Sequence, residues 1–144
     1  MSGAKVFIAW AEVEHMARRV AKTAQDFGPT AILAVTRGGL VPATLISHHL
    51  GVRRVETIQA ASYGQGHEQN AVRLGPTPTF TNSDRVLIVD DLIDTGLTLD
   101  AIVALYPTAR TAVLLNKHPS KTANYVGRHA NPSAWIVFPW EPVS

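Results

Sequence analysis

The most informative stretch of the sequence is Val86-Leu87-Ile88-Val89-Asp90-Asp91-Leu92-Ile93-Asp94-Thr95-Gly96-Leu97-Thr98. Its first four residues form a continuous apolar run, which is typical of a strand buried on both faces of a parallel sheet. Two adjacent carboxylates follow the run, and the residues from Leu99 to Leu105 then predict a helix that ends before Pro107. A buried strand, a polar turn and a helix in this order form the repeating unit of an α/β fold.

The turn after this strand combines two kinds of polar group. Asp90 and Asp91 offer oxygens that accept hydrogen bonds from hydroxyls and bind hard cations such as Mg²⁺. Thr95, Gly96 and Thr98 offer hydroxyls and backbone N–H groups at the start of a helix, where phosphate groups bind. A sugar phosphate presents both hydroxyls and phosphate, so the combined stretch predicts a sugar-phosphate site. Taken singly, the same residues also fit a structural role, in which the aspartates solvate the strand end and Thr98 caps the helix.

Strands and helices alternate along the rest of the chain. The expected elements are an amphipathic helix with an apolar stripe from Val13 to Phe27, a strand over 31–35, a helix from Pro42 to Leu50, a strand over 54–60 and a strand over 111–115. The alternation predicts one α/β domain over residues 1–144, with a mostly parallel central sheet flanked by helices.

Two segments do not fit this alternation. Residues 62–83 contain several glycines and prolines and few large apolar side chains, which predicts an irregular loop of about twenty residues, usually a lid over a site. The tail from Trp135 to Trp140 is aromatic and interrupted by Pro139. We expect this tail to cover part of the molecule instead of extending the sheet.

Composition excludes several classes of protein. The chain has no cysteine, so disulfides, thiolate metal sites and a cysteine nucleophile are all excluded. No apolar run approaches the roughly 18 residues of a membrane span, and the first residues lack the apolar core of a signal peptide. We therefore expect a cytoplasmic protein without a membrane partner.

Charge and histidine placement point away from two further kinds of site. The net charge is +2, and the basic pairs Arg18-Arg19 and Arg53-Arg54 are short and separated. They predict a solvated surface and no nucleic-acid partner. The six histidines show no paired spacing with acidic residues that indicates a metal site, so we interpret them as structural or surface residues.

The stretch 86–98 resembles the phosphoribosyl pyrophosphate (PRPP) signature of the type I phosphoribosyltransferases. The resemblance continues in Ala34-Val35-Thr36-Arg37-Gly38-Gly39-Leu40-Val41-Pro42, which is similar to the pyrophosphate loop of the family, and in Ser62-Tyr63-Gly64, similar to the start of its mobile loop. Trp135-Ile136 is similar to its base-covering hood. Chain length and motif spacing place the resemblance in the 6-oxopurine branch, nearest its bacterial members that use xanthine and guanine. The departures are Leu97, Asn116 before the lysine where a small residue is expected, and a short tail after Trp140.

The resemblance implies a role for each matching residue at the PRPP end of the site. Asp90 and Asp91 would hold the ribose hydroxyls and order Mg²⁺, and Asp94, Thr95, Gly96, Leu97 and Thr98 would wrap the 5′-phosphate. Asp94 would also be catalytic, accepting a proton or stabilising positive charge on the purine. Thr36, Arg37, Gly38 and Gly39 would bind pyrophosphate, and a peptide bond between Thr36 and Gly38 could be cis without proline. Without the PRPP motif, this loop would equally fit an ordinary strand-to-helix turn.

On the base side, the resemblance assigns roles to three residues. Lys117 would select an oxo group at purine C6, because an ammonium only donates hydrogen bonds. Trp135 would stack on the base, and the Ile136 carbonyl would accept from a 2-amino group. Alternatives to these roles are a solvated surface lysine and a core tryptophan.

The resemblance implies a purine salvage enzyme with a type I phosphoribosyltransferase fold and a small C-terminal hood over the base site. It would transfer phosphoribose from PRPP to N9 of guanine, xanthine or hypoxanthine, with Mg²⁺ as cofactor, and would act as a homo-oligomer, a dimer or tetramer. Two alternatives are a PRPP-sensing regulator and a phosphoribosyltransferase for another base. Lys117 and Trp135-Ile136 argue against the regulator, which would not need them, and Lys117 argues against adenine, whose 6-amino group is itself a donor.

Overall fold

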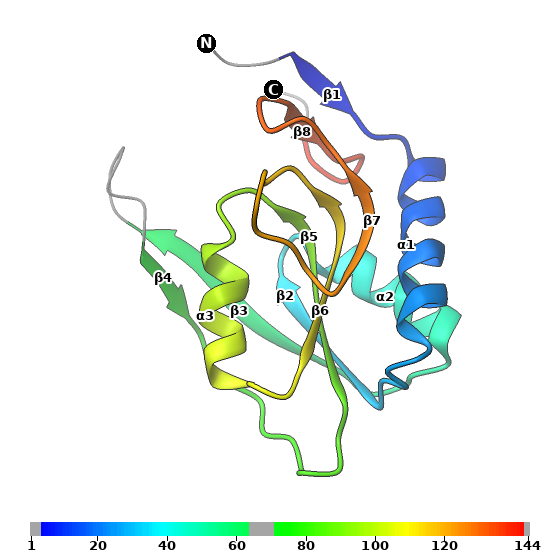
Figure 1. Cartoon of the computed structure of the whole chain (residues 1–144), viewed down its shortest axis with the longest axis vertical. Coiled ribbons are helices and arrows are strands. Elements are labelled where there is room, and N and C mark those ends of the chain that lie inside the picture. The colour runs from blue at the N-terminus through cyan, green and yellow to red at the C-terminus, as the bar shows by residue number, and fades with distance from the viewer. Residues whose placement is uncertain (1–3, 64–70, 143–144) are drawn as a thin grey trace.

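A mostly parallel sheet is built around the two apolar runs that end in the predicted loops. The computed structural model describes residues 4–63 and 71–142. In the six-stranded sheet the order is β4-β3-β2-β5-β6-β7, and only the edge strand β4 runs antiparallel (Figure 1). The strands are β2 (Ala31–Thr36), β3 (Val55–Tyr63), β4 (Ala71–Leu74), β5 (Val86–Ile93), β6 (Arg110–Asn116) and β7 (Tyr125–His129). The predicted fold class, a parallel sheet with flanking helices, is confirmed.

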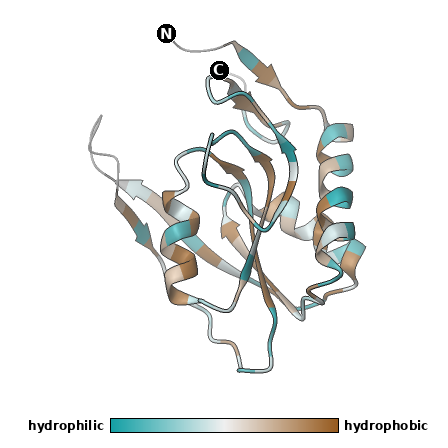
Figure 2. Ribbon diagram, in the orientation of Figure 1, coloured by the Kyte–Doolittle hydropathy of each residue, from teal (hydrophilic) through white to brown (hydrophobic). Residues whose placement is uncertain are grey.

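The two faces of the central strands belong to different hydrophobic cores. On one face, Ile32 and Leu87 pack with α1 (Trp10–Ala24) and α2 (Leu40–Leu50). On the other face, Leu33 and Ile88 pack with α3 (Leu97–Leu105). These strand residues are all 0% exposed, which explains why residues 31–35 of β2 and 86–89 of β5 are continuous apolar runs instead of alternating ones (Figure 2).

The helix α1 follows its predicted apolar stripe. Val13, Met16 and Val20 are fully buried on the sheet side, whereas Phe27 lies in the turn beyond the helix. At the start of α1, the Glu12 carboxylate accepts a hydrogen bond from the Ala9 backbone N–H at 2.8 Å, which satisfies one N–H group that the helix leaves free.

The tail forms a separate small sheet above the carboxyl ends of the main strands. Here β8 (Trp135–Val137) pairs in parallel with β1 (Lys5–Phe7) and with no strand of the main sheet (Figure 1). The prediction that the tail covers part of the molecule without extending the sheet is therefore confirmed. We call the pair β1 and β8 the hood.

The prediction of an irregular loop over residues 62–83 is wrong in part. β3 continues through Ser62 and Tyr63, and residues 71–74 form β4, which pairs with residues 60–63 of β3. The backbone groups of residues 71–74 find their hydrogen-bond partners in β3, and the glycine- and proline-rich composition of the segment does not show this pairing. Residues 64–70 of the predicted lid lie outside the described residues.

Candidate active site

Two carboxylates lie side by side at the end of β5. Asp90 is 8% exposed and Asp91 is partly buried, and the Asp91 backbone N–H donates to Asp90 Oδ1 at 2.8 Å. Burial raises the pKa of Asp90 well above its usual range, and the neighbouring Asp91 carboxylate raises it further. Burial also raises the pKa of Asp91. The pair therefore presents oxygen atoms whose charge the protein leaves poorly compensated.

The donor set of this pair fits Mg²⁺ held jointly with a ligand. Among the described residues, no cluster of three or more His, Asp or Glu side chains could hold a metal ion by itself. Mg²⁺ typically binds through one or two carboxylates together with water and substrate oxygens, so a complete protein cage is not required. A cation would also relieve the raised pKa of Asp90, because it favours the ionised carboxylate.

The turn after β5 forms a pocket at the start of α3. Gly96 has a φ of 82° and is the N-cap residue of the helix, and the Leu97 backbone N–H donates to Thr95 Oγ1 at 3.3 Å. The pocket has a volume of about 230 Å³. It is lined by Ser62, Asp90, Leu92, Ile93, Asp94, Thr95, Gly96, Thr98 and Leu99. The predicted phosphate-binding residues thus surround one cavity at a helix N-terminus, except Leu97, which is not part of its lining.

The loop after β2 meets this turn from the neighbouring strand. The Thr36–Arg37 peptide bond is cis, at the place where the resemblance suggested one. A Cβ atom on Gly38 would lie 2.3 Å from Asp91 Oδ2, and one on Gly39 would lie 2.4 Å from the Val89 carbonyl oxygen. Both positions therefore require glycine, because the loop backbone passes directly against the end of β5.

A second pocket joins this loop to the C-terminal tail. It has a volume of about 650 Å³ and is lined by Arg37, Gly38, Asp91, Trp140, Glu141 and Pro142. Trp140 stacks on Phe138 with ring centres 4.7 Å apart, which fixes the tail in place. Trp140 and Glu141 were not predicted as lining residues. The short tail after Trp140 was visible in the sequence, but the sequence did not show that its last residues lie beside the loop after β2.

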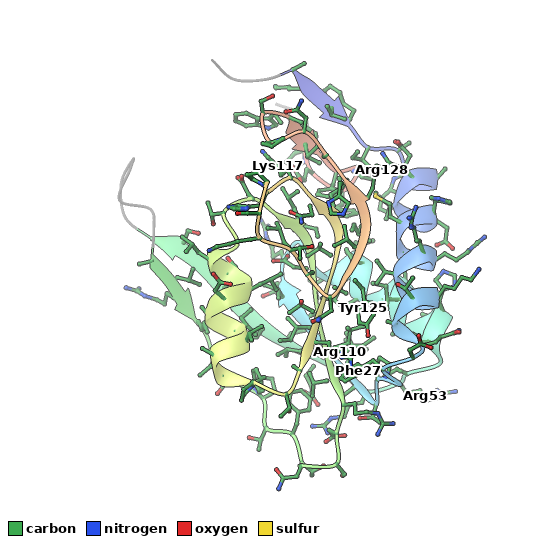
Figure 3. The ribbon with its side chains drawn as sticks, viewed as in Figure 1. Phe27, Arg53, Arg110, Lys117, Tyr125 and Arg128 are labelled. Atoms are coloured by element: carbon green, nitrogen blue, oxygen red, sulfur yellow. The ribbon has the colours of Figure 1, made fainter. Side chains whose placement is uncertain are left out.

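Lys117 lies between the turn after β5 and the hood (Figure 3). Its ammonium donates to the Ala134 carbonyl oxygen at 2.7 Å and lies 3.7 Å from Asp94 Oδ1. The Lys117 side chain is 14% exposed and that of Asp94 is 69% exposed. The structure therefore rejects the reading of Lys117 as a solvated surface lysine and brings it next to the predicted catalytic carboxylate.

The hood turns the Ile136 backbone toward the same side as Lys117. The Trp135 N–H donates to the Ala4 carbonyl oxygen, and the Val137 carbonyl oxygen accepts from Ile8, so residues 135 and 137 face β1. Because backbone groups alternate along a strand, the groups of Ile136 point to the opposite edge, as the Ala134 carbonyl does. Trp135 is 58% exposed, so it is not the core tryptophan of the alternative reading.

One large cavity contains none of the predicted site residues. It has a volume of about 550 Å³ and lies at the amino ends of β5 and β6, between residues 77–86 and 105–109. Ligands of parallel α/β sheets bind at the carboxyl ends of the strands, which is where all the predicted residues gather.

Ser62, predicted as part of the mobile loop, lines a different pocket, the one at the start of α3.

Comparison with known proteins agrees with this geometry. The family of phosphoribosyl transferase domains matches residues 8–142. The xanthine-guanine phosphoribosyltransferase of Gluconobacter oxydans (strain 621H) is 36% identical over 142 residues, covering 93% of this chain and 83% of that protein. The enzyme of the same name from Cereibacter sphaeroides (strain ATCC 17025 / ATH 2.4.3) is 32% identical over 143 residues, covering 93% of this chain and 85% of that protein.

Solved structures show the same fold. The purine phosphoribosyltransferase from Pyrococcus horikoshii Ot3 superposes with a TM-score of 0.84 at 31% identity, covering 97% of this chain and 95% of that one. The Helicobacter pylori xanthine-guanine-hypoxanthine phosphoribosyltransferase superposes with a TM-score of 0.79 at 27% identity, covering 96% and 94%. These matches confirm the predicted fold and family, and the chain belongs to the phosphoribosyl transferase domain family.

Proposed function

We propose that this chain is a purine salvage enzyme that transfers the 5-phosphoribosyl group from PRPP to N9 of a 6-oxopurine. Relatives named xanthine-guanine phosphoribosyltransferase support this activity. The observation that carries the proposal is the approach of Lys117 to Asp94, whose charged atoms are 3.7 Å apart beside the pocket at the start of α3. The transfer requires a cation that donates to the C6 oxygen of the base and a carboxylate that stabilises the positive charge developing on it, and both must lie beside the same base.

Each loop at the strand ends binds a different part of the PRPP molecule. The turn 94–98 binds the 5′-phosphate through its hydroxyls and the free N–H groups of the first turn of α3. Asp90 and Asp91 accept hydrogen bonds from the ribose hydroxyls. The loop 36–39 binds the pyrophosphate, since Gly38 allows its backbone to lie against Asp91. Asp90 and Asp91 would hold Mg²⁺, which would supply neutralisation of the charge on the pyrophosphate.

The transfer forms one bond and breaks another. N9 of the purine attacks C1 of the ribose, and the bond between C1 and the pyrophosphate oxygen breaks, with its electron pair leaving on the pyrophosphate. The ribose carries positive charge in the transition state, and the purine gives up one proton. Asp94 stabilises the positive charge on the base and accepts this proton.

Base selection follows from the direction of hydrogen bonding. The Lys117 ammonium has three donors and no acceptor, and one of the three is used on the Ala134 carbonyl oxygen. The remaining N–H groups of Lys117 are free to donate to an oxygen at C6. A 6-amino group cannot accept such a bond, because it is itself a donor. The Ile136 carbonyl accepts from a group at C2, and Trp135 stacks on the ring.

A nucleotide-formation assay tests the proposal. The purified protein is incubated with PRPP, Mg²⁺ and one base at a time: guanine, xanthine, hypoxanthine or adenine. We expect nucleoside monophosphate and pyrophosphate from the 6-oxopurines and almost none from adenine. Efficient use of adenine contradicts the role given to Lys117, and PRPP binding without turnover of any base favours a PRPP-sensing regulator.

We also infer that the chain acts as a homo-oligomer in the cytoplasm. The apolar side chains of Phe7, in the hood, and Trp10, at the start of α1, are 58% and 56% exposed in the single chain and offer surface for a second copy. Sedimentation at micromolar concentration tests this, and a purely monomeric protein contradicts it. No helix within the described residues is long and apolar enough to cross a membrane.

A further inference from the structure

Asn116 is the last residue of β6 and carries a buried amide side chain. The residue is only 2% exposed. It pairs with Ile93 of β5 on one side and with His129 of β7 on the other. The family resemblance leads one to expect a small residue here. A buried amide costs free energy unless its donors and acceptor are satisfied, so its hydrogen bonds show what it does.

Both ends of the Asn116 amide bind the turn that follows β6. The Oδ1 atom accepts from the His118 backbone N–H at 2.9 Å, and the Nδ2 group donates to the Lys121 carbonyl oxygen at 2.9 Å. We call residues 117–121 the lysine turn. One side chain therefore ties the beginning and the end of the lysine turn to the end of β6. Within the lysine turn, His118 Nδ1 accepts a hydrogen bond from the Lys121 backbone N–H at 2.8 Å, which joins its second residue to its last.

The two lysines of this turn reach different parts of the active site. Lys117 lies beside Asp94 and the Ala134 carbonyl, on the base side (Figure 3). Lys121 covers the phosphate side. A Cβ atom on Gly96 would lie 2.6 Å from Lys121 Cδ, so the aliphatic stem of the lysine packs on the turn after β5.

The ammonium of Lys121 also compensates a charge that opposes phosphate binding. It donates to Asp100 Oδ2 at 2.8 Å, and Asp100 lies in the first turn of α3. A carboxylate at this position competes with a phosphate for the positive end of the helix dipole. The Lys121 ammonium offsets this negative charge while its stem holds Gly96.

We propose that Asn116 is a positioning residue that sets Lys117 against the base and Lys121 against the phosphate turn at the same time. Without the amide, the lysine turn loses these two side-chain hydrogen bonds and keeps, at its start, the bond from the Lys117 backbone N–H to the Ile93 carbonyl oxygen at 3.1 Å. Both substrates then bind more weakly, although Asn116 touches neither. The inference rests on the proposed function, because it needs a base and a phosphate at the two sites.

The test compares Asn116→Ala with a matched control, Asn124→Ala. Asn124 lies just before β7 and binds the other end of β6, since its Oδ1 accepts from the Thr111 N–H at 2.9 Å and from Thr111 Oγ1 at 3.2 Å. Both changes remove an asparagine whose side chain forms two hydrogen bonds at an end of β6, but of the two only Asn116 holds the lysine turn. We expect Asn116→Ala to raise KM for hypoxanthine and for PRPP by about tenfold each, because each lysine must then be ordered when its substrate binds. The control is expected to leave both KM values unchanged.

Two further measurements separate positioning from general destabilisation. Hydrogen exchange of the backbone amides of residues 118–121 in the free protein is expected to speed up in Asn116→Ala and to stay unchanged in the control. In a Lys117→Met background, Asn116→Ala is expected to raise the PRPP KM as before but to have no further effect on the hypoxanthine KM.

The outcomes distinguish this inference from the proposed function. Unchanged KM values in Asn116→Ala, or equal rises in the control, contradict the inference while an active parent enzyme still supports the proposed function. An additive effect of Asn116→Ala on the hypoxanthine KM in the Lys117→Met background also contradicts it. A parent protein that forms no nucleotide contradicts the proposed function and, with it, the inference.

Discussion

The two ends of the parallel sheet treat charged groups in opposite ways. At the amino end, Arg54 lies 3.2 Å from the Asp84 carboxylate, and Arg110 donates to the Tyr125 hydroxyl at 2.7 Å (Figure 3). The Thr81 backbone N–H, as the largest contribution, lowers the pKa of Asp84. This end compensates its charges internally.

At the carboxyl end, the same kind of side chain has the opposite shift. Asp90 and Asp91 are adjacent, burial raises the pKa of both, and no ion pair among the described residues involves either. The difference shows how one sheet serves two purposes. The amino end pairs its charges within the protein. The carboxyl end has the ion pairs of Lys117 with Asp94 and of Lys121 with Asp100, but it also keeps two adjacent carboxylates, Asp90 and Asp91, that a ligand can satisfy.

The largest expected effect is that of Asp94→Asn at the carboxyl end. The variant keeps the size of the side chain but loses the group that accepts the proton, so we expect turnover to fall by about 10²–10⁴ with little change in PRPP affinity. Single-turnover rates and PRPP titration measure the two quantities separately. Asp84→Asn, at the amino end, is the control and should leave turnover unchanged. Near-normal turnover in Asp94→Asn would show that Asp94 only forms part of the phosphate turn.

Lys117→Met should have the next largest effect, on selectivity. Hypoxanthine and adenine differ at C6 and in the proton on N1, so the change in the ratio of their kcat/KM values from the parent to the variant reports the contribution of the Lys117 contact. We expect the ratio to fall by about 10²-fold or more, because a site built to bind a polar group strongly rejects its mismatch. PRPP affinity should remain nearly intact. Lys22→Met, on the exposed face of α1, is the control, and an unchanged ratio in Lys117→Met would refute the assignment.

Asp90→Asn should move binding and stability in opposite directions. Loss of a charged hydrogen bond should weaken PRPP binding by about 1.5–3 kcal/mol, with turnover also falling, and the same is expected of Asp91→Asn. The ligand-free variant should nevertheless be more stable than the parent at neutral pH, because it no longer buries an ionisable carboxyl beside another. Calorimetric titration and thermal unfolding measure the two effects.

The pH dependence of stability follows from the raised pKa of Asp90. Between its unfolded pKa, about 3.9, and its higher folded pKa, the folded state binds more protons than the unfolded state. The free energy of unfolding of the ligand-free parent therefore contains a contribution that is present at low pH and lost as pH rises through the folded pKa. The Tm difference between Asp90→Asn and the parent should grow with pH. A difference that is constant with pH would contradict the raised pKa.

The smallest expected effect lies at the amino end, in Arg110→Ala. The Arg110 guanidinium lies 4.7 Å from the centre of the Phe27 ring and also donates to the Tyr125 hydroxyl. Its loss should lower the free energy of unfolding by about 0.5–1 kcal/mol, the usual size of an exposed cation–π contact. The kcat/KM values should not change. Reduced activity of the folded variant would break the proposed division between the two ends.

Elements buried on both faces were predictable from local sequence. The apolar runs 31–35 and 86–89 are observed within β2 and β5, because any neighbour on either face of a central strand is apolar. The stretch 111–115 lies within β6 for the same reason. Polar residues directly after such runs must lie at the carboxyl edge of the sheet, which is why the aspartates and the loop 36–39 could be assigned to one site.

Strands that depend on a distant partner were missed. The three residues of β1 are all exposed and form a strand only because β8 lies beside them. In β7, Gly127 weakens the strand pattern, yet a Cβ atom there would lie 2.8 Å from Met16 Cβ. The glycine is needed where α1 packs closely on β7, and no local pattern reports that contact.

The sequence by itself determined which chemical groups follow each strand: two carboxylates and a helix start after β5, paired glycines after β2, and a lysine after β6. Only the tertiary structure decided that Lys117 faces Asp94, that Gly38 lies against Asp91, and that Asn116 holds both ends of the lysine turn. The reason is physical. Burial and turn chemistry act between neighbours along the chain, whereas these contacts join residues that only the order of the strands in the sheet and the packing of the loops bring together.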